Sequence, residues 1–253
     1  MFSIGQNVFT DIANKCGLTD ENYGLSDLDL VLTSTNYTEV KNNPLNPSTS
    51  MVRYKFLEVL VRIAFDKYVR RRKAANIVEA LDRILALVLP VYSEYNTEDW
   101  RWGQYLCEEV DLTLKHYKSI LDYIYNRFCG RKAKPHQKPF MSKEEWSELC
   151  SYSGLINDFF PARETDLVFN LAMSVRVDEL TESKHMEMTF VEFLEALARA
   201  CDKASMPPAD VPAGTWSPEA LQRQALSVKI RNAVPALLKL CPKSMHDAVM
   251  GEK

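Results

Sequence analysis

Histidine, cysteine and acidic side chains are the residues of this chain that could do chemistry. The four histidines are scattered, without the H-x-x-x-H or histidine–cysteine spacing that holds a metal ion. The six cysteines include no C-x-x-C pair, which favours reduced thiols in a cytoplasmic compartment. Glycine-rich phosphate loops and G-x-S-x-G nucleophile elbows are missing as well. We therefore expect a protein that is not an enzyme and needs no cofactor.

One recurring pattern could bind calcium through its acidic residues. In this pattern an apolar residue stands five positions before an aromatic residue. Four segments have this shape: Met141–Trp146, Met188–Phe193, Ile4–Phe9 and Met51–Phe56. In the first two, the aromatic residue directly follows an acid, Glu145 or Glu192. EF-hand calcium loops place an acidic ligand at their last position, ahead of the exiting helix. We expect the apolar residues to pair across two loops and the aromatic residues to seat their helices in the core.

The other calcium ligands are largely missing from these loops. Counting back from Glu192, the residues at loop positions 1, 3 and 5 are Thr181, Ser183 and His185, where an EF-hand needs oxygen donors. Ser183 and Glu192 are the weak calcium candidates that remain. In the loop before Phe56, Lys55 replaces the acid altogether. We expect no bound metal, with the loop geometry retained for packing.

The sequence also contains an internal repeat. Phe56–Arg62 and Phe193–Arg199 are near copies 137 positions apart, and the match extends without a gap from Phe9–Ala64 to Trp146–Cys201. Such self-similarity predicts a duplicated module. The residues that we expect in the structural core of the two copies are Phe9, Phe56, Leu60, Trp146, Met188, Phe193 and Leu197.

Periodicity, capping residues and breakers predict an all-α chain with two helical modules, a helical linker and a C-terminal helix. The expected helices lie near 5–16, 26–35, 53–71, 74–89, 99–128, 142–152, 163–174, 189–204 and 217–232, with Pro90 ending the fourth. The expected domains are 1–90, a linker at 91–103, a second module at 104–205, and a proline-containing connector with C-terminal helices at 206–253. A paired EF-hand unit has four helices, and the first module lacks its entering helix. We expect the 74–89 helix, the 217–232 helix or a partner protein to fill that place.

Val177–Arg199, together with its copy at Phe56–Tyr68, resembles EF-hand-related proteins of cilia and flagella in protists, a degenerate form of the calmodulin-like EF-hand superfamily. The resemblance implies a helical adaptor of the axoneme, a microtubule-associated structural assembly. We therefore predict a non-enzymatic scaffold protein that acts through protein–protein interaction in the ciliary or flagellar cytoskeleton. The alternative is a calcium-regulated EF-hand sensor that binds a partner helix.

Two basic runs and an aromatic cluster are the candidate contact residues. The nominated side chains are Arg70, Arg71, Arg72, Lys73, Arg131, Lys132, Lys134, Trp100 and Trp102. The basic runs are either solvated helix ends or a docking site for an acidic surface such as the tubulin tails. The tryptophans either pack between the modules or line a partner groove. The net charge of −3 and the short apolar runs predict neither a nucleic-acid nor a membrane partner.

A glutamate–arginine pair recurs in both copies, as Glu58 with Arg62 and as Glu195 with Arg199. Residues four apart lie on the same helix face, so each pair is either an ordinary surface ion pair or part of an interface.

Overall fold

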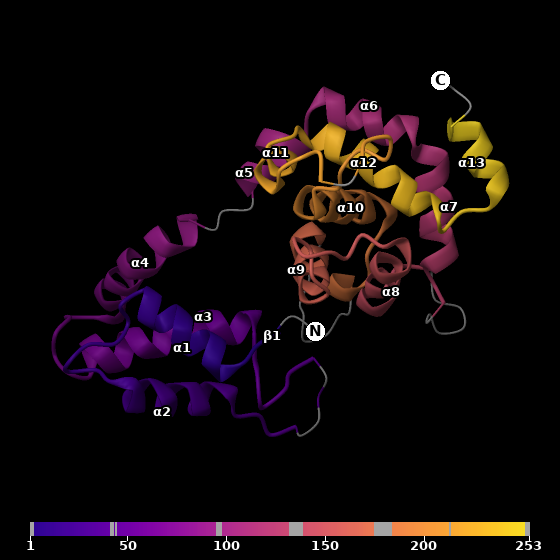
Figure 1. The fold of residues 1–253 in the computed structure, drawn as a ribbon. Coiled ribbons are helices and arrows are strands. Elements are labelled where there is room, and N and C mark those ends of the chain that lie inside the picture. Colours follow the sequence, from indigo (N-terminus) through magenta and orange to yellow (C-terminus); the bar gives the residue numbers. More distant parts are fainter. Residues whose placement is uncertain are drawn as a thin grey trace. The chain divides into compact units, whose positions relative to one another are not determined.

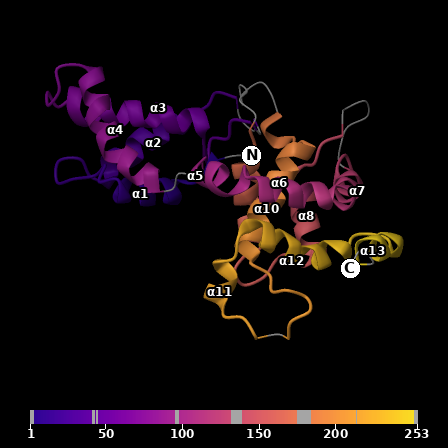
Figure 2. The same cartoon turned by 90° about the horizontal axis from the view of Figure 1, so that it is seen from above.

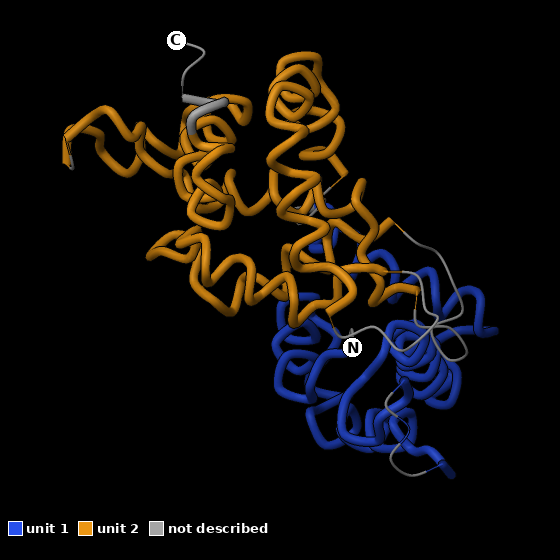
Figure 3. Tube along the Cα trace, turned by 90° about the vertical axis from the view of Figure 1, so that its right-hand side faces the viewer, with its two compact units in different colours: residues 1–96 blue, residues 97–253 orange. Residues whose placement is uncertain are grey.

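The computed structural model describes residues 3–40, 43, 45–94, 98–131, 139–174, 184–212 and 214–250. The chain divides into two compact units, Met1–Asn96 and Thr97–Lys253 (Figure 3). Both units are built almost entirely from helices, as the sequence predicts, so the chain is all-α. Over the described ranges, no helix has the length and apolar character needed to cross a membrane.

Unit 1 consists of four α-helices, one π-helix and two very short strands. In chain order they are β1 (Ser3–Ile4), α1 (Gln6–Lys15), α2 (Leu25–Asn36), β2 (Met51–Val52), α3 (Arg53–Ala64), the π-helix η1 (Phe65–Val69) and α4 (Ile77–Glu94). Strands β1 and β2 pair antiparallel, with Ile4 opposite Met51. This pairing brings the starts of α1 and α3 together, so that Phe9 and Phe56 meet edge to face at 6.0 Å.

The core of unit 1 also contains α4. Ala80 and Ile84 of this helix are fully buried in the cluster that holds Phe9 and Ile63. Helix α4, from one of the three segments expected to fill the first module, therefore packs in the core of unit 1, and its role as an entering helix stays a prediction. Leu60 is 5% exposed, and Phe56 is partly buried against the same cluster.

Unit 2 begins with α5 (Glu98–Trp100), the π-helix η2 (Arg101–Tyr105), α6 (Glu108–His116) and α7 (Lys118–Phe128). Then follow α8 (Lys143–Ser153), α9 (Arg163–Ala172), the 3-10 turn η3 (Lys184–Met186) and α10 (Phe190–Ala204). The chain ends with α11 (Pro218–Gln222), α12 (Leu226–Leu238) and α13 (Lys243–Met250). A loop at 205–217 separates α10 from α11 (Figure 2).

Helix α10 is the centre of unit 2, with α8, α9 and α12 around it (Figure 1). Its start is fixed by a capping box between Thr189 and Glu192. Most residues from Glu192 to Cys201 are buried, and Glu195 and Arg199 are buried with them. Four of the expected core residues are fully buried in this unit: Trp146, Met188, Phe193 and Leu197.

Several expected helix boundaries differ from those in the structure. Pro90 lies inside α4 and does not end it, because Leu87 and Val91 pack against the core on either side and hold the helix together. The expected helix at 99–128 is divided into α5, η2, α6 and α7. The break after η2 occurs at Leu106, which leaves the helical region with φ −84° and ψ 59°.

The helix expected over 53–71 ends its α-helical part at Ala64 and continues as η1. Near the C-terminus, the helix expected at 217–232 is two helices, and α12 runs through Pro235. Burial of Ile230, Val234 and Leu237 holds α12 in place across the proline.

Candidate functional site

The apolar residues of the four loop segments pair as predicted. Ile4 lies opposite Met51 in the strand pair of unit 1. Met141 and Met188 form an isolated antiparallel bridge in unit 2, with both N···O distances at 3.0 Å. Each bridge joins two loops back to back and fixes the first turns of the helices that follow.

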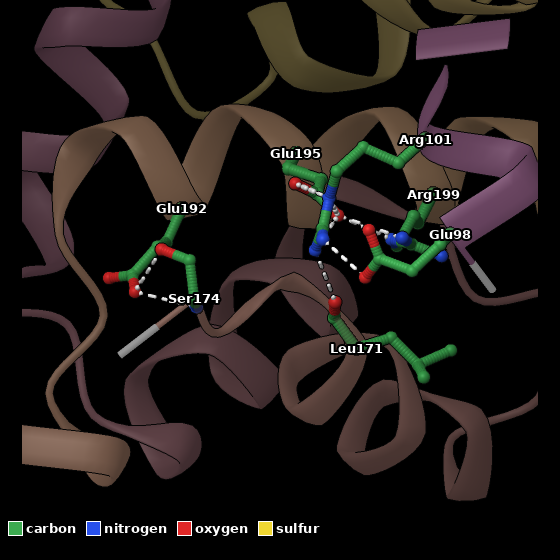
Figure 4. A network of polar contacts seen from close by, with 7 residues as sticks. All are labelled: Glu98, Arg101, Leu171, Ser174, Glu192, Glu195 and Arg199. Atoms are coloured by element: carbon green, nitrogen blue, oxygen red, sulfur yellow. Dashed lines mark hydrogen bonds and ion pairs between the residues drawn. The ribbon is translucent and has the colours of Figure 1, made fainter. Parts of the chain in front are cut away.

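Glu192 closes its loop with hydrogen bonds from the chain itself (Figure 4). Oε1 accepts hydrogen bonds from the backbone N–H and the hydroxyl of Ser174, at 3.0 and 3.1 Å. Oε2 accepts them from the backbone N–H and the hydroxyl of Thr189, both at 2.8 Å. The carboxylate thus joins the end of α9 to the start of α10, and both of its oxygens are engaged. Ser183, the other weak calcium candidate, lies outside the described residues.

Lys55 closes the matching loop of unit 1 with the opposite charge. The residue is 1% exposed, and its Nζ donates to the carbonyl oxygens of Asn36 at 3.1 Å and Pro47 at 3.0 Å. Burial lowers the pKa of Lys55 because the ammonium loses water. The ammonium therefore joins the end of α2 to the loop before α3, where an EF-hand would hold a metal ion between carbonyl and carboxylate oxygens.

Metal-binding side chains do not cluster among the described residues, and four of the six cysteines are buried. Among the residues that the structure describes, no three histidine, cysteine, aspartate or glutamate side chains gather into a metal site. Cys150 and Cys201 are fully buried, and burial raises the pKa of Cys201 to about 12. A thiol with so high a pKa carries almost no thiolate near neutral pH, and the thiolate is the nucleophile.

A network of ion pairs lies along one edge of α10, where Glu195 and Arg199 are buried (Figure 4). The Glu195 carboxylate accepts hydrogen bonds from two arginines, Arg199 of its own helix at 2.9 Å and Arg101 of η2 at 2.9–3.1 Å. Arg101 also donates to the Leu171 carbonyl at the end of α9. The hydrogen bonds to Glu195 raise the pKa of the Arg101 guanidinium, so this side chain keeps its positive charge.

Trp100 completes this edge. The guanidinium of Arg199 lies 4.1 Å from the centre of the Trp100 ring, and the indole N–H donates to Asp202 at 2.8 Å. Lys229 of α12 reaches the same aspartate at 2.7 Å. The recurring glutamate–arginine pair is thus an interface between segments in unit 2. In unit 1, Glu58 and Arg62 form an exposed surface pair.

The nominated basic residues lie on the surface, several of them paired with acids. Arg70 bonds Asp66 and Arg71 bonds Asp27, both at 3.0 Å. Arg72 and Lys73 are exposed at the turn before α4. Arg131 bonds Glu148, whereas Lys132 and Lys134 lie outside the described residues. The two nominated tryptophans differ, because Trp102 is 71% exposed and Trp100 is held against α10.

Matching turns recur at the 137-residue spacing. Asp20 accepts hydrogen bonds from the backbone N–H groups two and three residues later, and Asn157 does the same. Asp20 also reaches η1, which follows α3, and Asn157 reaches the last residue of α10. Asp20 bonds the Lys67 ammonium at 2.9 Å, and Asn157 donates to the Ala204 carbonyl at 2.8 Å.

Sequence reasoning missed Lys55 and Arg101 as site residues. The lysine at the last loop position was a usable signal, since its ammonium could donate hydrogen bonds to the carbonyl oxygens of the loop. The contacts of Arg101 with α9 and α10 had no signal, because these partners lie 70 and 94 residues away. Comparison with protein families, curated proteins and solved structures found no match to this chain.

Proposed function

We propose that this chain is a non-enzymatic structural adaptor built from two degenerate EF-hand-like modules. One observation carries the proposal: the last loop position of each module closes the loop within the chain. Glu192 receives four hydrogen bonds from Ser174 and Thr189, and Lys55 supplies a cation to the carbonyls of its own loop. Because Glu192 and Lys55 are both held by their own loops, we infer that calcium does not organise these two loops and that the modules keep one shape.

A duplication explains why the modules match. The bridge between Ile4 and Met51 recurs 137 residues later as the bridge between Met141 and Met188. The turn at Asp20 recurs at the same spacing as the turn at Asn157. Two modules of fixed shape in one chain suit a scaffold, because each can hold a different neighbour at a fixed place.

We place the adaptor in the ciliary or flagellar axoneme, as the likeness of Val177–Arg199 to flagellar EF-hand-related proteins implies. Arg72 and Lys73 are exposed beside the 75% exposed side chain of Arg70. A basic surface of this kind would be attracted to the acidic tails of tubulin at low ionic strength. The partners would then be proteins of a microtubule-associated assembly.

Calorimetry with calcium chloride tests the structural proposal against the sensor alternative. We expect no heat of binding at micromolar concentrations and the same unfolding temperature in calcium and in chelator. Micromolar calcium binding at any site would overturn the adaptor proposal in favour of the sensor. For the location, a tagged copy should remain on detergent-extracted axonemes, and a diffuse signal lost on extraction would exclude the axonemal assignment.

A further inference from the structure

Helix α3 and η1 expose an apolar stripe on the surface of unit 1. Leu57, Val61 and Phe65 are spaced four residues apart, so they follow one face of the helix. Their exposed fractions are 62%, 40% and 51%. We call these three residues the α3 stripe. Three consecutive apolar side chains on one exposed helix face are unusual for a surface that meets only water.

An ion pair lies beside the α3 stripe, and a hollow that none of the three stripe residues lines opens farther toward α2. Glu58 and Arg62 form an ion pair at 2.7 Å on the adjacent face, and Arg62 also donates to Ser34 of α2. Next to Ser34, a hollow of about 600 Å³ opens between α2 and η1. Its lining includes Leu30, which is 72% exposed. The edge between α2 and α3 therefore combines apolar contact area, a depression and a carboxylate.

Unit 2 shows what covers this kind of edge. The residues 137 positions after the α3 stripe are Leu194, Ala198 and Asp202 of α10. Ala198 is fully buried, and the tryptophan of α5 donates to Asp202. Two elements reach this edge: α12, whose Lys229 bonds Asp202, and the helical turn Glu98–Tyr105, which presents Trp100 and Arg101 to α10.

The charged residues on the edges of α3 and α10 favour the same kind of occupant. Glu195 accepts hydrogen bonds from Arg199 and from the incoming Arg101. On α3, Glu58 pairs with Arg62 of its own helix at Oε1, so an incoming arginine would reproduce the arrangement of unit 2. On α3, Phe65 and Val61 stand where α10 has Asp202 and Ala198. The side chain next to the incoming arginine would therefore meet an apolar surface and needs no polar group.

We propose that the edge formed by the α3 stripe, Glu58 and Arg62 is a docking site for a helical segment of a partner protein. The segment carries an aromatic or large aliphatic side chain that packs on Val61 and Phe65, and an arginine beside it that pairs with Glu58. This inference rests on the proposed adaptor function, and it names the kind of partner that the first module holds.

A selection from a displayed library of helical peptides on the full-length chain tests the docking site. The selection is run in chelator, so its outcome does not depend on whether the chain binds calcium. We expect enriched peptides with an aromatic or large aliphatic residue and an arginine on one face. Val61→Asp should weaken their binding at least tenfold, whereas Leu112→Asp, a matched change at a 57% exposed leucine of α6, should not.

A charge exchange then tests the predicted ion pair. Glu58→Arg should weaken the selected peptide, and replacing the peptide arginine by glutamate should restore binding to that variant. Circular dichroism and thermal unfolding verify that each variant is folded. Peptides that bind the Val61→Asp or the Glu58→Arg variant as tightly as they bind the unchanged chain would overturn the site. A concentration-dependent dimer that Val61→Asp abolishes would identify a second copy as the occupant and overturn the partner.

Discussion

Replacing Lys55 by methionine tests the idea that the first module carries its own cation. Methionine keeps most of the side-chain volume and removes the ammonium. The native ammonium is buried and donates to the carbonyls of Asn36 and Pro47. After the substitution, both carbonyl oxygens lose that donor inside the loop, where a missing partner costs free energy.

The size of the effect follows from two opposing contributions. A hydrogen bond to a charged group contributes about 1.5–3 kcal/mol, so losing two predicts about 3–6 kcal/mol. Removing the ammonium also removes the cost of burying it, which is why burial lowers the pKa of Lys55. We expect a net loss of about 2–4 kcal/mol in the free energy of unfolding of unit 1. For a unit of this size that corresponds to a fall of roughly 10–20 °C in its midpoint temperature.

Urea unfolding of the full-length chain, followed by circular dichroism, measures this change. Lys55→Glu should lose more stability than Lys55→Met, because its carboxylate would face two carbonyl oxygens. Lys73→Met, at an exposed position of the same unit, should change the free energy of unfolding by less than about 0.5 kcal/mol. If Lys55→Met unfolds within that same margin of the unchanged chain, the loop does not depend on its internal cation.

Three further predictions concern other buried contacts. Glu192→Gln keeps one acceptor oxygen in place of two and should destabilise unit 2 by about 1–3 kcal/mol, equally in calcium and in chelator, as measured by urea unfolding. Arg101→Ala leaves the buried Glu195 with one arginine and should cost about 2–4 kcal/mol by the same measurement. The Lys67 hydrogen bond holds the pKa of Asp20 below its usual value, so its stabilisation is present above about pH 4 and is lost as the pH falls through the lower folded pKa. Lys67→Met should therefore flatten the acid-side fall in the stability of unit 1, followed by urea unfolding between about pH 2 and 7.

Matched controls separate these effects from general damage. Glu109→Gln and Arg223→Ala change exposed residues of unit 2, and each should shift the free energy of unfolding by less than about 0.5 kcal/mol. A Glu192→Gln chain that loses stability only when calcium is present would contradict closure within the chain. An Arg101→Ala chain as stable as its control would show that the network contributes little. If Lys67→Met leaves the pH dependence of the free energy of unfolding unchanged, the pair of Asp20 with Lys67 does not contribute to stability on the acid side.

The sequence predicted those features of the fold that depend on neighbouring residues. The capping box at Ser142 was readable because a cap and its partner lie three residues apart. The pairing of Met141 with Met188 was readable because the loop pattern places each apolar residue at a fixed distance from its helix. The breaks at 98–128 were not readable, since the contacts of Trp100 and Arg101 come from residues far along the chain.

The glutamate–arginine pairs separate what the sequence determined from what the tertiary structure decided. By itself, the four-residue spacing put Glu58 beside Arg62 and Glu195 beside Arg199 on their helices. Whether each pair faces water depended on packing. On α10 the turn at 98–105 lies over the pair and buries it with Arg101, whereas on α3 the same pair stays exposed. Burial is a property of everything that packs around a residue, so two nearly identical local sequences acquired different roles.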